Sequence, residues 1–374
     1  MVDRTSGPPS SSELISRAEA LVPLLRENAV KAEELRRLPD DSIRALDEAG
    51  LFRMTQPVRH GGYGTDAATV ARVMTLIASG CAATTWVMMI YNAVADLAEL
   101  LPEQALAEIY ADAHPKIAGV FGKAGAVIEP VDGGFRVRGQ GRWPFNSGCH
   151  HAAWDLLRVT VEQPDRASGT AFAAVPMSDL TICDDWHVMG ALGTGSNTVT
   201  CDDLFIPEHR VGHLVGDPRS VIRMDLSVAQ NVTMPLGMAR HALEYFLALA
   251  KTHGIAHLGY ERMVDAPVVH AAVTTAAVNI KMIEAYQQWA LSALDPGTGG
   301  MDQRDRAILG AGSSGCFRLA REAIEGLYAL CPSAEIHLER PIQRLIRDVH
   351  VFEHQHALTP FINYELYGRV LCSS

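Results

Sequence analysis

The chain has 374 residues, of which 48% are hydrophobic and 20% charged, and its 32 basic and 43 acidic side chains give a formal net charge of −11 at pH 7. This length and composition exclude intrinsically disordered, collagen-like and small disulfide-stapled proteins, and they fit a soluble globular protein of two or three structural units. The acidic charge, without any run of lysine or arginine, also argues against nucleic acid or an anionic membrane surface as a partner, so a small-molecule ligand is expected.

The cysteines and the N-terminal segment bear on location. The seven cysteines are scattered, odd in number and never in a C-x-x-C pair, which predicts reduced thiols. The N-terminal segment contains no apolar signal sequence, and the longest near-apolar stretch, Thr84 to Val94, is far shorter than the roughly 20 residues that a bilayer-spanning helix needs. We therefore expect a cytoplasmic protein without membrane contact.

The first part of the chain is predicted to be helical. Residues 1–12 are rich in serine, proline and glycine and are expected to form a mobile leader. From residue 13 to 114, apolar residues recur three and four positions apart, which is the spacing of one face of a helix. Within this part, the glycine-rich run HGGYGTD predicts a loop that opens the helix after Asp66.

The pattern changes twice after that. Between residues 115 and 215 short runs alternate, as where Phe135 and Val137 are interleaved with Arg136, and turn residues interrupt them, which predicts an antiparallel sheet or barrel. From residue 216 to 374 long apolar stripes at helical spacing predict a bundle of about four helices. The predicted fold class is therefore α+β and mostly α, with an N-terminal helical domain, a middle β-barrel domain and a C-terminal four-helix bundle.

Several common catalytic and nucleotide-binding motifs are missing. The sequence contains no H-E-x-x-H, G-x-S-x-G or P-loop motif. The run from Gly193 to Gly195 begins like a dinucleotide-binding fingerprint, but it lacks the third glycine and follows no predicted βαβ unit. A Rossmann site is therefore not expected.

Two features of the last predicted segments have ordinary explanations. His350 and His354 are spaced i, i+4 and could share a helix face, but no further ligand is evident, so we expect no metal site. Arg344, Arg347 and Asp348 resemble a helix-face ion-pair set, because Arg344 and Asp348 are also spaced i, i+4. Exposed pairs of this kind are usually worth under about 1 kcal/mol, so we interpret these residues as structural.

Three longer segments are more informative together. They are GRWPFNSGCHHAAW (Gly141 to Trp154), MGALGTGSNTVTCDDLFIPEHRV (Met189 to Val211) and ERPIQRLIRDVHVFEHQHAL (Glu339 to Leu358). In this order, on a chain predicted to run from helices through a β domain to helices, they resemble the acyl-CoA dehydrogenase superfamily. Within it, they resemble the oxygenase components of two-component, reduced-flavin-dependent monooxygenases. The resemblance implies the acyl-CoA dehydrogenase-like fold, a homotetramer, and a flavin between the β domain and the C-terminal bundle.

The resemblance also bears on the reaction. The dehydrogenases of this superfamily use a glutamate in a Tyr-Glu-Gly-Thr context as the base, and that context is absent here. Counting on from Arg347 and Asp348 without a gap places His356 where the glutamate would be. A histidine has a pKa near the working pH and can act as acid or base beside the reacting oxygen. We therefore predict His356 as the catalytic acid/base, with His354 as the second choice.

The turn after Trp143 is predicted to face the flavin. The resemblance implies that Ser147 and Asn146 meet the N5 edge of the ring, and it makes Trp143 and Phe145 candidates for flavin contact, although aromatic residues at a strand end are commonly core. A strand-ending turn, in which the serine and asparagine satisfy only local backbone groups, remains the alternative.

Two further segments are candidates for flavin binding. The loop that contains Gly193, Thr194 and Ser196 offers successive donors, although a hairpin connection would use the same residue types. The superfamily holds the flavin phosphate with an arginine from a neighbouring subunit, and that arginine is not at its expected place. Arg262 is the candidate substitute, and Lys251 is the alternative, because either charge can pair with phosphate.

The candidate substrate contacts lie on two segments. The resemblance places Trp86, Tyr91 and Asn92 on the helix beside the flavin and substrate cavity, although a buried apolar helix explains the neighbouring methionines equally well. His150 is predicted to contact substrate. His151 is predicted to contribute to catalysis on the substrate side of the flavin, and a histidine hydrogen-bonded beneath the barrel is the alternative.

The leading prediction is the oxygenase component of a flavin-dependent monooxygenase. It would take reduced FMN or FAD from a separate NAD(P)H:flavin reductase, react with O2 through a C4a-hydroperoxyflavin and oxygenate a small, aromatic or heteroatom-bearing substrate. The first alternative is an FAD-dependent dehydrogenase or desaturase of the same fold, which would hold oxidised FAD tightly. The second is a non-catalytic tetrameric binding or scaffold protein, which would bind no flavin.

Overall fold

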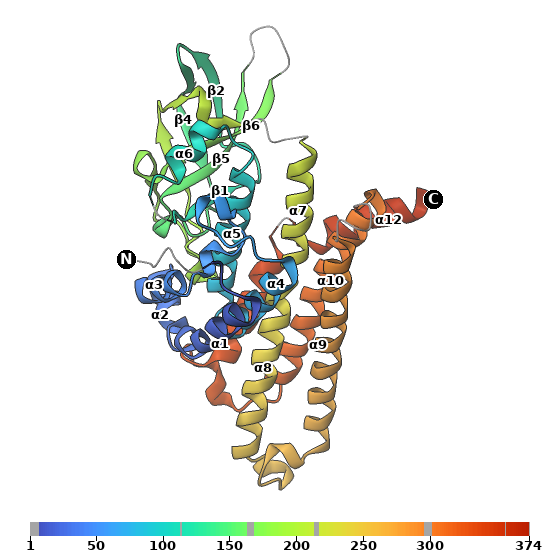
Figure 1. Ribbon diagram of the computed structural model, residues 1–374. Coiled ribbons are helices and arrows are strands. Elements are labelled where there is room, and N and C mark those ends of the chain that lie inside the picture. The colour runs from blue at the N-terminus through green and yellow to red at the C-terminus, as the bar shows by residue number, and fades with distance from the viewer. Residues whose placement is uncertain are drawn as a thin grey trace.

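A computed structural model describes residues 7–112, 114–162, 168–212, 217–294, 301–355 and 357–373. It confirms the predicted class: a helical part comes first, a sheet region follows, and long helices form the remainder (Figure 1). None of the described helices is both long and apolar enough to cross a membrane.

The N-terminal part begins with helices whose ends are capped by side chains. Ser10 and Glu13 form a reciprocal capping box at the start of the first helix, and the Asp66 carboxylate accepts the Thr69 N–H at 2.9 Å, so Asp66 begins the helix predicted to follow it. The helices here are α1 (Ser11–Glu27), α2 (Ala29–Leu35), α3 (Asp40–Glu48), α4 (Ala67–Gly80), α5 (Ala82–Ala98) and α6 (Glu103–Ile109), with the short 3-10 turns η1 (Leu51–Arg53) and η2 (Val58–His60) between α3 and α4.

The described strands form two sheets that share a core, rather than one closed barrel. The larger sheet has seven strands in the order β10-β6-β5-β2-β3-β9, with β1 paired to β5, and the smaller has the order β4-β8-β7. Trp143, Val159 and Val199 lie in the shared core. The strands are β1 (Ile117–Val120), β2 (Ala126–Val131), β3 (Gly134–Val137), β4 (Gln140–Trp143), β5 (Trp154–Val161), β6 (Gly169–Pro176), β7 (Thr181–Ile182), β8 (Val199–Asp202), β9 (Phe205–Pro207) and β10 (Val211–Gly212).

The C-terminal part is built from long helices that pack along one another (Figure 1). Helix α10 contacts both α8 and α9, and α12 projects away from the body of the molecule. The helices are α7 (Pro218–Gln230), α8 (Thr233–Thr252), α9 (Pro267–Ala293), α10 (Gln303–Tyr328), α11 (Pro341–Glu353) and α12 (Pro360–Ser373).

Helix α5 joins the three parts. Its N-terminal half lies in the main helical core with residues of α4, α8 and α11, whereas Val94 and Ala95 in its C-terminal half pack in a second core with residues of β1, β5 and β6. Most residues of α5 are buried, which explains its largely apolar sequence. A polar group on α5 is therefore held rigidly against both the β domain and the bundle.

Candidate active site

The turn after β4 carries a strained and exposed aromatic residue. Phe145 has a φ of +64° and is 71% exposed. Its ring meets that of Trp186 edge-on, with the ring centroids 6.2 Å apart. A bulky residue in this left-handed region costs on the order of 1–3 kcal/mol, and such residues cluster at functional sites. Phe145 thus presents an exposed ring at the turn, and the buried Trp186 packs against it.

The rest of the turn is buried and fixed. Gly148 donates its N–H to the Thr194 carbonyl at 2.9 Å and accepts the Tyr91 hydroxyl at 2.5 Å. Trp143 has no exposed surface and donates its indole N–H to the Arg158 carbonyl at 2.8 Å, so the structure places it in the β-domain core instead of on the face of the turn.

A line of buried hydroxyl groups meets the turn. The Trp86 indole N–H donates to Ser147 Oγ at 2.8 Å, Ser147 Oγ lies 2.8 Å from Ser196 Oγ, and Ser196 Oγ lies 2.7 Å from Thr194 Oγ1. The Thr194 hydroxyl in turn donates to the Ala191 carbonyl at 2.8 Å. The structure therefore brings together a predicted substrate residue on α5, the predicted flavin-edge serine and the predicted loop residues. We call Trp86, Ser147, Ser196 and Thr194 the hydroxyl chain.

Helix α11 holds the loop at the end of the hydroxyl chain. The Asp348 carboxylate accepts the Ala191 N–H at 2.6 Å, and the Arg347 guanidinium donates to the Met189 carbonyl at 3.0 Å. Between them, a Cβ on Gly190 would lie 2.3 Å from the Arg347 carbonyl oxygen, so only glycine fits against the helix.

This arrangement corrects the interpretation of these residues as an exposed ion-pair set. Asp348 and Arg344 are buried, and both Arg344 and Arg347 face Glu33 of α2, at 3.6 Å and 2.8 Å. Burial raises the pKa of the Asp348 carboxyl to about 6. The three residues lie at the junction of all three parts, which their helical spacing alone does not reveal.

A second buried carboxyl lies behind the turn. Asn146 is fully buried and its side-chain amide donates to the Asp155 carboxylate on β5. Burial raises the pKa of Asp155 to about 7. The amide oxygen of Asn146 and the second oxygen of Asp155 have no hydrogen-bond partner among the described residues. Asn146 therefore supports the turn from behind.

The two histidines after the turn contact the N-terminal part and the loop. His150 is exposed, and its Nε2 lies 2.8 Å from Asn197 Oδ1; because the Asn197 amide nitrogen donates to the Cys183 carbonyl, His150 is the donor. His151 Nε2 lies 3.0 Å from Asp40 Oδ1 of α3. Burial, followed by the nearby Arg37 charge, lowers the pKa of His151.

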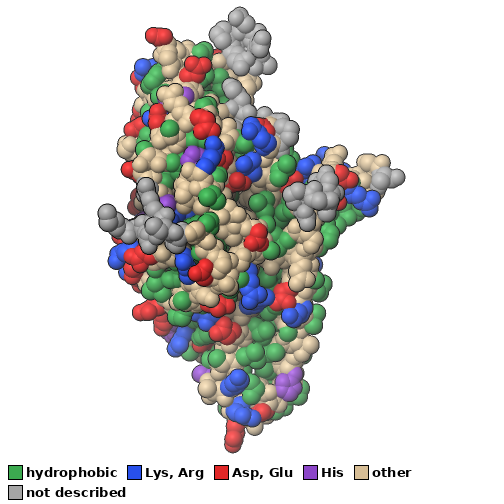
Figure 2. Space-filling view, viewed as in Figure 1, with side chains coloured by type: hydrophobic (Ala, Val, Ile, Leu, Met, Phe, Trp, Pro, Cys, Tyr) green, Lys and Arg blue, Asp and Glu red, His purple; other side chains and the backbone are tan. Residues whose placement is uncertain are grey.

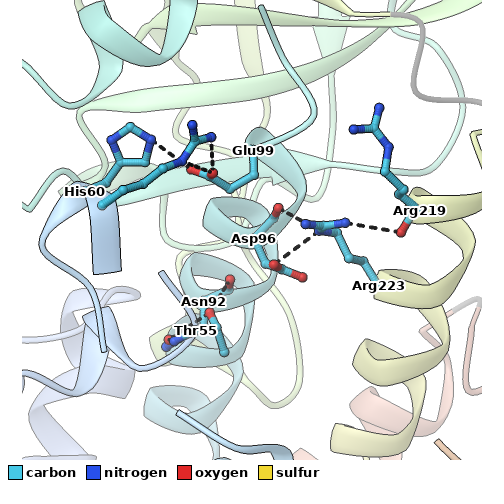
Figure 3. Close-up of polar contacts among 8 residues, drawn as sticks. Thr55, His60, Asn92, Asp96, Glu99, Arg219 and Arg223 are labelled. Carbon is cyan, nitrogen blue, oxygen red and sulfur yellow. Dashed lines mark hydrogen bonds and ion pairs between the residues drawn. The ribbon is translucent and has the colours of Figure 1, made fainter. Parts of the chain in front are cut away.

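Asn92, a predicted substrate contact, has both ends of its amide engaged. Its oxygen accepts the Thr55 N–H at 3.2 Å, and its nitrogen donates to the carbonyls of Leu51 and Met88. Figure 3 shows Asn92 turned toward Thr55, one turn of α5 before Asp96, which pairs with Arg223 of α7. Asn92 is fully buried and ties the loop after η1 to α5.

The remaining predicted residues are not gathered at the turn within this chain. Arg262 lies in the connection between α8 and α9, at the end of the bundle away from the β domain, and pairs with Asp265 at 2.9 Å (Figure 1). His354 is exposed at the end of α11, and His356 lies outside the described residues. His350 contacts Glu325 at 2.8 Å, and the described residues contain no cluster of metal-ligating side chains.

Three residues of the site were not predicted from the sequence: Phe352 and Trp186 carried no signal, and Asp348 was interpreted as structural. Phe352 of α11 packs its ring 5.4 Å from that of Trp86, and Trp186 and Asp348 contact the turn and the loop from distant segments. Phe352 thus brings the C-terminal end of α11 against Trp86 of the hydroxyl chain.

Comparison with known proteins agrees with this architecture. Family models for the acyl-CoA dehydrogenase N-terminal domain and C-terminal domain match residues 18–104 and 231–360. The oxygenase subunit HsaA of a flavin-dependent monooxygenase from Rhodococcus jostii (strain RHA1) is 30% identical and aligns over 95% of this chain and 97% of its own. The oxygenase component of an FADH(2)-dependent resorcinol hydroxylase from Rhizobium sp. (strain MTP-10005) is 30% identical over 90% of this chain and 88% of its own.

A solved structure extends the similarity to three dimensions. XiaF from Streptomyces sp., in complex with FADH2 and glycerol, superposes with a TM-score of 0.90 at 28% identity and covers 97% of this chain and 96% of its own. The chain therefore belongs to the acyl-CoA dehydrogenase superfamily and, within it, to the family of oxygenase components of flavin-dependent monooxygenases.

Proposed function

We propose that this protein is the oxygenase component of a two-component monooxygenase, which uses reduced FMN or FAD and O2 to oxygenate a small aromatic substrate. The observation that carries the proposal is the turn at Phe145 and Ser147, where the exposed ring of Phe145 lies two residues before the serine of a buried line of hydroxyl groups. The family relationship supports the substrate class, since relatives include hydroxylases named for resorcinol and p-hydroxyphenylacetate.

The residues at the turn fit a flavin. The isoalloxazine ring needs an apolar face and polar groups at its edge, and Phe145 with Trp186 offers the first while Ser147 offers the second. When bound, the reduced flavin supplies the electrons that activate O2. Because the turn is anchored to the hydroxyl chain and α11, the chain presents these groups to the flavin in a fixed geometry.

We propose that the catalytic acid/base lies in the segment at and after the end of α11. We assign it to His356, with His354 as the second choice, because Phe352 brings this end of α11 against Trp86. A histidine beside the reacting oxygen can deliver a proton there, and it can remove a proton from an aromatic hydroxyl group.

The assembly that we propose is a homotetramer built on the bundle. Exposed apolar side chains gather on the bundle and on α12, and Figure 2 shows hydrophobic groups over this face. A groove of about 440 Å³ between α8 and α9 is lined by Leu243, Leu247 and Ile280 together with charged residues. A neighbouring copy would also bring its Arg262 to a flavin bound by this chain.

The proposed location is the cytoplasm. The partner reductase consumes NAD(P)H, and the cysteines are free thiols, which both fit that compartment.

The proposal is tested by anaerobic titration of the purified protein with FMNH2 and FADH2, followed by oxygenated buffer that contains a phenol. We expect tight binding of one reduced flavin and a hydroxylated product detected by mass spectrometry. His356→Ala should keep the flavin affinity and lose most of the product, and His354→Ala is the comparison. Tight binding of oxidised FAD with no product would indicate a dehydrogenase, and no binding in either redox state would indicate a scaffold.

A further inference from the structure

The hydrogen-bond partners of the hydroxyl chain fix the direction of every proton in it. The Ala191 carbonyl can only accept, so the Thr194 hydroxyl must donate its single proton there. The contact at 2.7 Å between Thr194 and Ser196 then requires Ser196 to donate. By the same logic the contact at 2.8 Å between Ser196 and Ser147 requires Ser147 to donate, and its proton points away from the turn.

Ser147 Oγ is consequently left as an acceptor. A hydroxyl oxygen has two lone pairs and one proton. The proton goes to Ser196, one lone pair receives the Trp86 indole N–H at 2.8 Å, and one lone pair remains. Trp86 cannot reverse this order, because an indole N–H is only a donor.

The surrounding structure maintains this order. Ser147, Ser196 and Thr194 are each at most 5% exposed, so bulk water does not compete for their protons. The Ala191 carbonyl that ends the chain belongs to a residue with a φ of +54°, whose N–H is held by Asp348. Ala191, at the end of this line, and Phe145, two residues before Ser147, are both strained residues.

We infer that Thr194 and Ser196 are positioning residues that make the site selective for the reduced state of the flavin. This inference rests on the proposed function, in which Ser147 meets the N5 edge of the ring. N5 of a reduced flavin carries a hydrogen and is a donor, whereas N5 of an oxidised flavin has only a lone pair. An oxygen held as an acceptor binds the first and repels the second.

This differs from the role predicted for the loop from the sequence. Thr194 and Ser196 were candidates for direct contact with the flavin, but their hydroxyl protons are already committed within the protein. They act through Ser147. The selectivity also suits a co-substrate that must arrive reduced and leave oxidised.

The test compares the dissociation constants of FMNH2 and FMN, measured anaerobically and aerobically by quenching of tryptophan fluorescence. Thr194→Val keeps the shape and removes the hydroxyl, which frees Ser196 to donate to Ser147 and Ser147 to donate to N5. Ser196→Ala removes the acceptor for the Ser147 proton. Thr194→Ser is the conservative variant. Thr85→Val is the matched control, because Thr85 is a buried threonine on α5 whose hydroxyl donates to the Cys81 carbonyl at 3.3 Å and is not part of the hydroxyl chain.

We expect the wild-type protein, Thr194→Ser and Thr85→Val to bind FMNH2 more tightly than FMN. In Thr194→Val and Ser196→Ala, the dissociation constant of FMN divided by that of FMNH2 should fall by about tenfold. This is the change expected when one hydrogen bond is lost in one redox state and gained in the other. With flavin labelled with 15N at N5, the N5 proton of the bound reduced form should move upfield in both variants.

Two results would overturn the inference, and they can be told apart. If the wild-type protein binds reduced flavin but the ratio in Thr194→Val and Ser196→Ala equals that in Thr85→Val, the positioning role is wrong and the proposed function stands. If the wild-type protein binds neither redox state, the proposed function fails and takes the inference with it. Circular dichroism identifies a variant that does not fold, and the other of the two variants then decides.

Discussion

Several single residues at the site have backbone conformations or surroundings that are unfavourable in isolation. Phe145 and Ala191 have positive φ angles, and Asp155 and Asp348 are carboxyls in fully buried surroundings. Each costs free energy, and the surrounding packing maintains it because the alternative would be to unfold a larger region. Their concentration around one turn supports a functional interpretation of that turn.

The buried Asp155 predicts how stability depends on pH. Its pKa is about 7 in the folded protein and 3.8 without burial, so between these values the folded state holds a proton that the unfolded state has lost. The stability contribution of this group is therefore present at low pH and is lost as pH rises to 7. Asp155→Asn should abolish that loss. The free energy of unfolding of the variant minus that of the wild type should therefore increase by on the order of 2 kcal/mol from pH 5 to pH 8.5.

Urea unfolding at fixed protein concentration, followed by circular dichroism, measures this difference. Asp202→Asn is the control, since Asp202 is exposed on β8 and should change stability equally at both pH values. If Asp155→Asn differs from the wild type by the same amount at pH 5 and at pH 8.5, Asp155 does not titrate in this range.

At the scale of elements, α11 fixes the loop from residue 189 to 196. We call the contacts of Arg347 and Asp348 with this loop the clamp. Asp348 and Arg347 hold the backbone of the loop, and Glu33 of α2 neutralises the arginines behind them. The clamp matters because the same loop supplies the carbonyl that orders the hydroxyl chain. Helix α11 of the bundle therefore helps to fix the direction in which the Ser147 hydroxyl of the β domain donates its proton.

Gly190→Ala tests the clamp. The added Cβ would lie 2.3 Å from the Arg347 carbonyl oxygen, so the loop must move away from α11. We expect a loss of about 1–3 kcal/mol of stability, as for other overpacked sites, together with a several-fold weaker affinity for reduced flavin. Gly122→Ala is the control, because no atom lies within 4 Å of its new Cβ, and it should change stability by less than about 0.5 kcal/mol.

Thermal unfolding and the FMNH2 titration measure the two effects of Gly190→Ala. Equal stability of Gly190→Ala and Gly122→Ala would show that the loop is not tightly packed against α11.

At the scale of the whole molecule, a single chain leaves its bundle incompletely covered. Val278 and Met282 on α9 are 50% and 52% exposed, and Phe361 on α12 is 76% exposed. Val273, Ala277 and Ala285 extend the apolar surface along α9. Monomeric proteins rarely expose contiguous apolar surfaces of this kind, which supports the proposed tetramer.

Charge on this surface should disrupt the assembly. Placing aspartate at both Val278 and Met282 would bury carboxylates in an apolar interface, so we expect the mass measured by light scattering after size-exclusion chromatography to fall from four chains to fewer. Val131→Asp changes a similarly apolar, exposed residue of β2 in the β domain and should leave the mass unchanged. A tetramer that survives the double substitution would place the interface elsewhere.

Local sequence patterns were sufficient to predict the order of the three parts. Helical spacing, alternation and turn residues are local properties, and they identified the helices on either side of the sheet region as well as the cap at Asp66. The segments around Ser147 and Gly193 were singled out as a turn and a loop that belong together, and the structure joins them through the contact between Ser147 and Ser196. The resemblance that these segments carried also indicated the family to which the chain belongs.

What those residues contact depends on packing between distant segments of the chain. Trp143 and Asn92 have the residue types of ligand contacts but are buried, and Asp348 has the spacing of a surface ion pair but binds a backbone amide across 157 positions of the chain. The direction of the proton on Ser147 depends on Trp86 of α5 and on Ser196, Thr194 and Ala191 of one loop, so three separate segments, with that of Ser147 itself, must come together. A hydrogen bond depends on distance and on the partners already engaged, and neither is a property of local sequence.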